Sequence, residues 1–131
     1  LKPNIIEAMD TLERETENND GLVVNFCLSY GGRAEIIDAT KTIVKKVQNN
    51  EISFDDINEN VFNKNLYHNL PDVDFLIRTS GEQRISNFML WQISYAELYF
   101  PKVYFPDFDP EELEKAFQEY ESRDRRFGKV K

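Results

Sequence analysis

Two short apolar runs, separated by segments of mixed polarity, dominate the pattern of this sequence. Residues 73–77 and 22–28 are apolar at nearly every position, which is typical of strands buried on both faces of a parallel sheet. A weaker strand candidate, residues 103–105, lies between prolines. Strands that alternate with helices predict an α/β fold, with a largely parallel sheet flanked by helices. Because only two strands are convincing, we expect this sheet to be incomplete in the chain.

Helical periodicity accounts for most of the remaining sequence. Residues 3–17 carry an apolar stripe with charged residues outside it, and short helical pieces are expected at 54–57 and 61–65. Asp109 precedes Pro110 and two glutamates, which is the pattern of a capped helix start. A further helix should run from the glycines at 31 and 32 to about residue 48. Its predicted buried face is Ile36, Ile37, Thr40, Ile43, Val44 and Val47.

Length, charge and cysteine content narrow the class of protein. The 131 residues fit one domain, residues 1–131, and 40% hydrophobic residues exclude a disordered chain. A net charge of −8 argues against nucleic acid as a partner, because such binding needs a basic surface. A single cysteine, Cys27, expected in the core, favours a reducing cytoplasm, and isolated His68 is expected at the surface. The chain opens at Leu1 without a methionine, so we expect it to be part of a longer protein.

Polar chemistry begins where the apolar run at 73–77 ends. Arg78 follows that run directly, and Arg84 and Ser86 lie a few residues further on. Ser86 is predicted to cap a short helix whose free N–H groups would face the same space as the arginines. Two guanidiniums, a hydroxyl and a helix start suit an oxyanion, above all a phosphate or diphosphate, beyond the carboxyl end of a strand. The alternative is that Arg78 pairs with a carboxylate at the strand end.

Several nearby residues have two interpretations each. Glu82 lies between the two arginines and either orients them by ion pairing or meets substrate, whereas Ile85 would offer its backbone N–H. Glu97 lies in an otherwise apolar segment, where a lone carboxylate is costly to bury. Its partner is either a divalent ion such as Mg²⁺ or a buried arginine. Gly31 and Gly32 permit a tight strand-to-helix turn, which we favour, or a close approach of phosphate.

Three motifs in this sequence have the composition and order of a known family. The first is D-F-L-I-R-T-S-G-E-Q-R-I-S-N-F-M-L-W-Q-I-S-Y-A-E-L-Y-F over residues 74–100. The second is S-Y-G-G-R at 29–33, and the third comprises P-D-F-D at 106–109 with R-R-F-G at 125–128. Together they resemble the motifs of the cis-prenyltransferases, the undecaprenyl diphosphate synthases in particular. That family has N-Y-G-G-R where this chain has serine at position 29. The match covers essentially the whole chain.

The resemblance implies a fold and a reaction. The fold is a parallel α/β sheet that encloses a hydrophobic tunnel, in a cytoplasmic homodimer. The reaction is successive condensation of isopentenyl diphosphate onto an allylic diphosphate, farnesyl diphosphate, to build a long lipid carrier for cell-wall sugars. Peripheral membrane association would follow from the lipid product.

The resemblance also implies roles for particular residues. Arg78, Arg84 and Ser86 match the family's isopentenyl diphosphate ligands, and a tail of the form R-x-G approaches the same diphosphate. Glu97 matches the family's Mg²⁺ ligand, which reaches the ion at the neighbouring subunit's site. The substrate-binding set implied in this way is Arg78, Glu82, Arg84, Ile85, Ser86, Arg126 and Gly128.

The departure from the family concerns its first motif. The family opens with a motif like H-x-x-x-x-M-D-G-N-x-R-W, whose catalytic aspartate holds Mg²⁺ and the allylic diphosphate, and a later asparagine assists proton removal. Neither motif occurs here, so no catalytic residue is assigned. We expect residues 1–131 to be the carboxyl-terminal part of the catalytic domain, inactive alone. Two alternatives remain: a non-catalytic partner subunit of a heteromeric cis-prenyltransferase, and an unrelated phosphate-binding α/β module.

Overall fold

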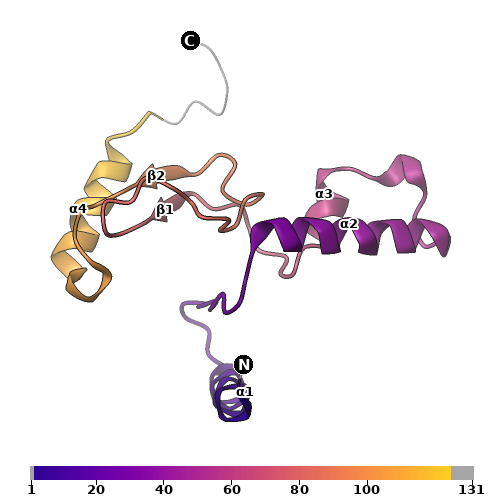
Figure 1. Cartoon of the computed structure of the whole chain (residues 1–131), viewed down its shortest axis with the longest axis horizontal. Coiled ribbons are helices and arrows are strands. Elements are labelled where there is room, and N and C mark those ends of the chain that lie inside the picture. Colours follow the sequence, from indigo (N-terminus) through magenta and orange to yellow (C-terminus); the bar gives the residue numbers. More distant parts are fainter. Residues whose placement is uncertain (1, 125–131) are drawn as a thin grey trace.

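The computed structural model describes residues 2–124 of the chain (Figure 1). In chain order the elements are α1 (Pro3–Thr16), α2 (Gly32–Gln48), the 3₁₀ turn η1 (Phe54–Asp56), α3 (Glu59–Asn63), β1 (Phe75–Ile77), β2 (Glu97–Tyr99), the 3₁₀ turn η2 (Phe105–Asp107) and α4 (Pro110–Glu121). The helices expected at 3–17, up to about residue 48 and after Asp109 are therefore confirmed, and the short pieces expected at 54–57 and 61–65 correspond to η1 and α3.

The sheet of the described residues consists of β1 and β2. The two strands are parallel, with Phe75 opposite Glu97 at one end and Ile77 opposite Tyr99 at the other. The Arg78 N–H donates to the Tyr99 carbonyl at 2.9 Å and extends the pairing beyond β1. Parallel strands need a long crossover, which the chain between them provides. This arrangement confirms the predicted α/β class with a parallel sheet.

α4 lies beside this sheet (Figure 1). The Tyr120 ring of α4 packs against Phe75 of β1 with the ring centroids 5.0 Å apart, and Ala116 has no exposed surface. The helix begins as predicted, because the Asp109 carboxylate accepts the Glu112 N–H at 3.0 Å. The strand expected at 103–105 does not form, so this prediction is wrong. Residue 105 instead begins η2, whose second residue, Pro106, has no N–H to pair in a sheet.

The buried side of α2 overlaps the predicted one only in part. Its buried residues include Glu35, Ala39 and Ile43, which recur at four-residue spacing on one side of the helix. Ile43 belongs to the predicted face and is 4% exposed, whereas Ile37 and Val44 of that face are 54% and 49% exposed. The prediction followed the large aliphatic residues and therefore missed Glu35 and Ala39.

The strand predicted at 22–28 does not form, and this prediction is wrong for the described chain. Leu22, Val23 and Phe26 are 91%, 79% and 68% exposed, and Cys27, expected in the core, is also exposed. The backbone bond at Leu28 is local, from its N–H to the Phe26 carbonyl. A strand needs a neighbour to pair with, and within residues 2–124 no strand lies beside this segment. α1 likewise stands apart from the other elements (Figure 1).

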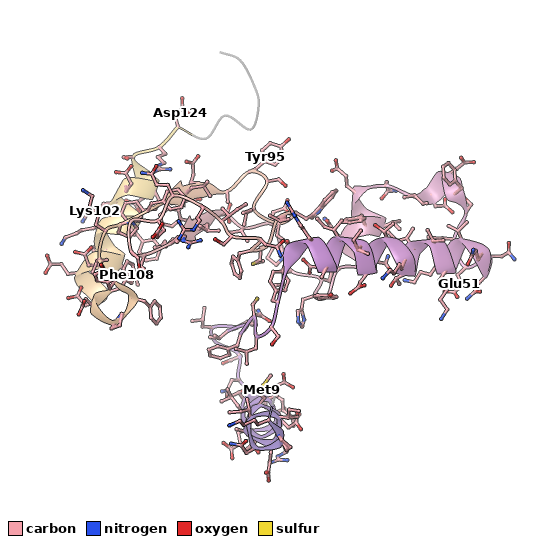
Figure 2. The ribbon with its side chains drawn as sticks, in the orientation of Figure 1. Met9, Glu51, Tyr95, Lys102, Phe108 and Asp124 are labelled. Atoms are coloured by element: carbon pink, nitrogen blue, oxygen red, sulfur yellow. The ribbon has the colours of Figure 1, made fainter. Side chains whose placement is uncertain are left out.

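Most side chains of α1 and of the segment after it are exposed, whereas Met9 is half-buried (Figure 2). No helix in residues 2–124 has the length and apolar character needed to cross a bilayer.

Candidate functional site

Arg78 turns back from the end of β1 onto the loop that follows it. Its Nη1 donates to the Arg84 carbonyl at 2.6 Å and to the Ser86 Oγ at 2.9 Å. Both hydrogen bonds use the same nitrogen, Nη1. The other N–H groups of the guanidinium can donate to a further acceptor. One side chain thus links the strand end to residues 84–86. We call residues 78–86 the anion loop.

The backbone of the anion loop is anchored to the segment after β2. Ser80 and Gly81 have φ angles of +73° and +67°, in the left-handed region that glycine adopts readily and serine rarely does. The Ser80 N–H donates to the Val103 carbonyl and the Gly81 N–H to the Pro101 carbonyl, both at 2.7 Å. These bonds hold the sharp turn in place and set the direction in which the loop leaves β1.

Arg84 is the exposed arginine of the anion loop. Its guanidinium pairs with Glu82, and the two side chains are 60% and 46% exposed. Such a pair adds little stability, so a more highly charged anion can replace the carboxylate. Ile85 is half-buried and lines, with Phe88 and the end of β1, a cavity of about 230 Å³. The structure therefore brings Arg78, Ser86 and the Arg84 main chain together, while the Arg84 guanidinium faces Glu82.

Residues 86–93 form turns, so the helix predicted to begin at Ser86 is wrong. Ser86, Asn87 and Met89 have φ angles of +46°, +65° and +44°, which a right-handed helix does not admit. The Ser86 hydroxyl accepts from Arg78 instead of capping backbone N–H groups. The sequence pattern misled because its apolar residues pack against two different neighbours instead of forming one helical stripe.

Asn87 contacts the start of α2, where the two glycines lie. The Gly32 N–H donates to the Asn87 carbonyl at 2.8 Å, and the Arg33 N–H donates to the Asn87 Oδ1 at 2.9 Å. A Cβ on Gly32 would lie 3.0 Å from the Leu90 nitrogen and 3.2 Å from the Asn87 carbonyl oxygen. The glycines thus serve a tight turn and close packing, and the first N–H groups of α2 are occupied. This confirms the turn interpretation over the phosphate one.

A buried carboxylate behind this contact was missed by the sequence reasoning. Glu35 is 2% exposed and accepts hydrogen bonds from the Tyr30 hydroxyl, from the Tyr67 N–H at 3.2 Å and from the Gln92 Nε2 at 3.1 Å. Its donors come from three separate segments, so the carboxylate joins the glycine turn, the approach to β1 and the region after the anion loop. The signal was present in the sequence, because Glu35 precedes Ala39 by one helical turn.

Among the three groups that donate to Glu35, the Tyr30 hydroxyl can ionise, and its pKa is shifted. Burial raises the pKa of Tyr30 well above its ordinary value of 10.0, and the hydrogen bond to Glu35 raises it further. The phenol therefore keeps its proton, and its hydrogen bond to Glu35, to a higher pH than an ordinary tyrosine would.

Glu97 begins β2 and forms an ion pair with Arg123. The Glu97 Oε2 lies 2.9 Å from the Arg123 Nη1, which also donates to the Leu98 carbonyl at 3.0 Å. The hydrogen bond to Glu97 raises the pKa of Arg123. Of the two partners that the sequence left open for Glu97, residues 2–124 supply the arginine.

Two carboxylates that a divalent ion could use lie in this region, those of Glu97 and Glu119, and both pair with Arg123. Within residues 2–124 no group of three or more His, Cys, Asp or Glu is arranged to hold a metal. Mg²⁺ commonly takes one or two protein carboxylates together with substrate phosphates, so Glu97 fits as a single ligand if the others come from elsewhere. The strand register places Glu97 and Arg78 at opposite ends of the two-stranded sheet. Arg126 and Gly128 lie outside the described residues.

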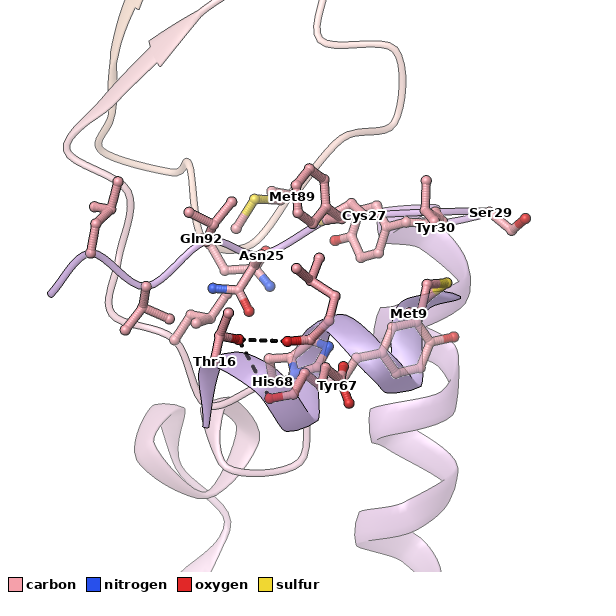
Figure 3. A pocket seen from close by; sticks show the side chains of 18 of the residues that line it. Met9, Thr16, Asn25, Cys27, Ser29, Tyr30, Tyr67, His68, Met89 and Gln92 are labelled. Atoms are coloured by element: carbon pink, nitrogen blue, oxygen red, sulfur yellow. Dashed lines mark hydrogen bonds between the residues drawn. The ribbon is translucent and has the colours of Figure 1, made fainter. Parts of the chain in front are cut away.

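A second cavity, of about 800 Å³, is lined by residues other than Arg78 and Arg84 (Figure 3). Met9 and Thr16 of α1 line it from one side, and Asn25, Tyr30 and other residues of the 22–30 segment from another. Its described lining is largely apolar, includes acidic residues such as Glu35 and contains no lysine or arginine. This cavity is therefore unsuited to a diphosphate.

Comparison with known proteins places the chain in a family. Residues 1–128 match the model of the family described as "Putative undecaprenyl diphosphate synthase". An isoprenyl transferase of Fusobacterium nucleatum is 51% identical over 125 residues, which span 95% of this chain and 52% of that protein. A ditrans,polycis-undecaprenyl-diphosphate synthase ((2E,6E)-farnesyl-diphosphate specific) of Haemophilus influenzae is 51% identical over 123 residues, which span 93% of this chain and 52% of that protein.

The fold of the chain is also similar to a solved structure. The lavandulyl diphosphate synthase of Lavandula x intermedia, in complex with dimethylallyl diphosphate, superposes with a TM-score of 0.93 at 37% identity, over 98% of this chain and 56% of that one. The chain thus spans about half the length of the relatives it matches. The family match excludes the unrelated phosphate-binding module. With the family model covering nearly every residue, this chain belongs to the undecaprenyl diphosphate synthase family of cis-prenyltransferases.

Proposed function

We propose that this chain supplies the isopentenyl diphosphate subsite of a cis-prenyltransferase. The observation that carries the proposal is the anion loop, in which Arg78 holds the Arg84 main chain and the Ser86 hydroxyl together at the end of a parallel strand. Ligands in open α/β sheets bind beyond the carboxyl ends of the strands, which is where this loop lies. Residues 1–131 would form the carboxyl-terminal part of the catalytic domain.

Arg84 is the proposed primary ligand of the diphosphate. Its guanidinium is exposed, and its present partner is a single carboxylate, Glu82, which a diphosphate with more charge would displace. Glu82 would then hold the guanidinium in place before substrate arrives. Arg78 would contribute its remaining N–H groups while keeping Ser86 in position, and Ile85 would offer its backbone N–H. Arg126 and Gly128 are proposed to approach the same diphosphate from the tail.

The proposed reaction is successive condensation of isopentenyl diphosphate onto an allylic diphosphate. The name of the Haemophilus influenzae relative specifies farnesyl diphosphate, which supports this compound as the allylic substrate. Holding isopentenyl diphosphate by its charged end would orient its double bond toward the carbon from which the allylic diphosphate departs. No residue of the described chain is assigned to that departure, so we expect this chain alone to bind but not to transfer.

Magnesium is the proposed metal, with Glu97 as one ligand. When bound, Mg²⁺ would neutralise the charge that develops on the departing diphosphate. Glu97 would have to exchange Arg123 for the ion, which its partial exposure permits. As the family resemblance implies, Glu97 is proposed to serve the site of a second copy in a homodimer.

The charge and the cysteine of the chain bear on its partners and its cellular compartment. The net charge of −8 argues against nucleic acid as a partner. The exposed thiol of Cys27 supports the reducing cytoplasm as the compartment. Peripheral association with membranes would follow from the lipid product.

The test measures steady-state kinetics of the full-length enzyme, by which we mean this chain joined to the half that only its relatives span. Arg84→Ala should raise the KM for isopentenyl diphosphate about a hundredfold, because a charge-assisted contact is worth roughly 1.5–3 kcal/mol. Arg14→Ala is the matched control, since Arg14 is an exposed arginine on α1 that hydrogen-bonds to Thr11. Equal KM values for Arg84→Ala and wild type would contradict the proposal. Binding of isopentenyl diphosphate without transfer by the full-length protein would identify the non-catalytic partner subunit instead.

A further inference from the structure

Asn87 connects the anion loop to a helix that begins far away in the sequence. α2 starts after Gly31, which has no side chain with which to cap the helix. Asn87, 54 positions from Arg33, supplies the missing acceptors: its Oδ1 receives the Arg33 N–H at 2.9 Å and its carbonyl receives the Gly32 N–H at 2.8 Å. A capping residue normally precedes its own helix, so this long-range contact is a structural link and not local capping alone.

We propose that Asn87 is a positioning residue for the isopentenyl diphosphate site, acting through Ser86. This inference rests on the proposed function of the anion loop. By holding the start of α2 with both its side chain and its main chain, Asn87 fixes the backbone of the residue before it. That backbone aims the Ser86 hydroxyl at the Arg78 guanidinium, 2.9 Å away.

The backbone around Asn87 is a tight left-handed turn. Ser86 and Asn87, with φ angles of +46° and +65°, are its two central residues, and the Phe88 N–H closes it by donating to the Ile85 carbonyl at 3.0 Å. The bonds from Gly32 and Arg33 to Asn87 join this turn to the start of α2. If they are lost, the turn is no longer held against the helix, and the Ser86 hydroxyl can move away from Arg78.

A second contact keeps the neighbouring segment folded when Asn87 is altered. Gln92 is 4% exposed and donates to the buried Glu35 carboxylate at 3.1 Å. The indole of Trp91 also donates to the Oδ1 of Asn63, the last residue of α3. Residues 91 and 92 therefore remain attached to α2 and α3, and a change at position 87 should act on the anion loop without unfolding the chain.

The first test is Asn87→Gly in the full-length enzyme. Glycine accepts a φ of +65° without strain, so this substitution removes the side-chain cap and relaxes the constraint on Ser86 without a steric clash. The matched control is Asn58→Gly, because the Asn58 Oδ1 accepts the Val61 N–H at 3.0 Å and caps α3 in the same way. Each variant loses one capping hydrogen bond. The bond lost in Asn87→Gly adjoins the anion loop, whereas the bond lost in Asn58→Gly lies at the start of α3.

We expect Asn87→Gly to raise the KM for isopentenyl diphosphate about tenfold, with kcat and the KM for the allylic substrate close to wild type. Asn58→Gly should lower thermal stability to a similar extent and leave every kinetic parameter unchanged. An unaltered KM in Asn87→Gly would overturn the inference. If Arg84→Ala also leaves this KM unaltered, the proposed function fails as well, and if Arg84→Ala raises it, the failure is confined to Asn87.

A second variant approaches the same contact from the opposite side. A Cβ on Gly31 would lie 2.8 Å from the Asn87 Nδ2, so Gly31→Ala pushes the Asn87 side chain away from the helix start. Gly31 has an extended backbone, with φ of −157°, which alanine adopts freely. We expect the KM for isopentenyl diphosphate to rise about threefold or more, by the same route. Should Asn87→Gly fail to fold, a wild-type KM in Gly31→Ala would overturn the inference on its own.

Discussion

Two apolar runs of this chain look alike in sequence and have opposite environments in the structure. Leu76, in the run that forms β1, is 8% exposed, whereas Leu22, in the run at 22–28, is 91% exposed. β1 has β2 beside it and α4 against it, and the other run has no paired strand within residues 2–124. An apolar run therefore indicates that a segment tends to be buried, but burial depends on whether a neighbouring surface exists.

The contrast extends to the regions around these runs. The anion loop and the start of α2 are held by hydrogen bonds between named groups: Arg78 to Ser86, Asn87 to Arg33, and Tyr30 to Glu35. α1 and the segment at 22–28 depend on apolar contact and have few neighbours. The chain exposes 10586 Å², compared with about 7,200 Å² for a compact chain of this mass. The polar site is thus organised within this chain, and the apolar segment is not.

The largest expected effect tests whether the buried side of α2 stabilises the site region. Ile43 is 4% exposed, so Ile43→Ala should lower the free energy of unfolding by about 3 kcal/mol through lost burial and the cavity left behind. Ile37, on the same helix, is 54% exposed, and Ile37→Ala should change it by less than about 0.5 kcal/mol. Urea unfolding of the chain measures both. Equal losses would show that the two faces of α2 are not distinguished as described.

An intermediate effect is expected where two backbones meet closely. Gly32→Ala places a Cβ 3.0 Å from the Leu90 nitrogen and 3.2 Å from the Asn87 carbonyl oxygen, and backbone atoms cannot yield cheaply. We expect a loss of about 2 kcal/mol in unfolding free energy. Gly21→Ala is the control, because a Cβ there meets nothing within 4 Å. If thermal melting showed the two variants to be equally stable, the close approach of α2 to residues 87–90 would be wrong.

The smallest effect concerns pH. Because burial and the Glu35 bond raise the pKa of Tyr30 in the folded state, its stabilisation is present below the ordinary value of 10.0 and is lost as the pH rises above it. Tyr30→Phe should cost about 1 kcal/mol at neutral pH through the lost hydrogen bond. The aromatic packing against Phe88 should survive in this variant.

The pH profile of unfolding checks this prediction. Above pH 10 the wild type should lose stability more steeply than Tyr30→Phe, because the variant has no phenol to ionise at this position. Parallel profiles for the two proteins would contradict the assigned environment of Tyr30.

How much of the fold the sequence predicts depends on the range of the forces involved. α4 was predictable because Asp109, Pro110 and the following glutamates act within one turn. β1 and the position of Arg78 after it were predictable because a buried strand is a continuous apolar run. β2 was not expected, since Glu97 interrupts its apolar pattern, and the ion pair with Arg123 that permits this lies 26 positions away.

The candidate site also has a part that the local sequence predicts and a part that it does not. Arg78 and Arg84 could be predicted as anion ligands because they follow a buried strand. The role of Asn87 could not, because its partner Arg33 on α2 lies 54 positions away. The helix predicted at Ser86 failed because residues 86 and 87 form a left-handed turn, which the Phe88 N–H closes by donating to the Ile85 carbonyl. Glu35 was overlooked because a glutamate on a helix is usually solvated, and only three donors from other segments make its burial tolerable.

The most direct test of the proposed subsite is a crystal structure of the full-length enzyme with isopentenyl diphosphate. We predict diphosphate oxygens about 2.7–3.2 Å from the Arg84 guanidinium and from the Ser86 hydroxyl, with Arg84 released from Glu82. A diphosphate bound away from residues 78–86, with Arg84 still paired to Glu82, would contradict the central claim that the anion loop holds this substrate.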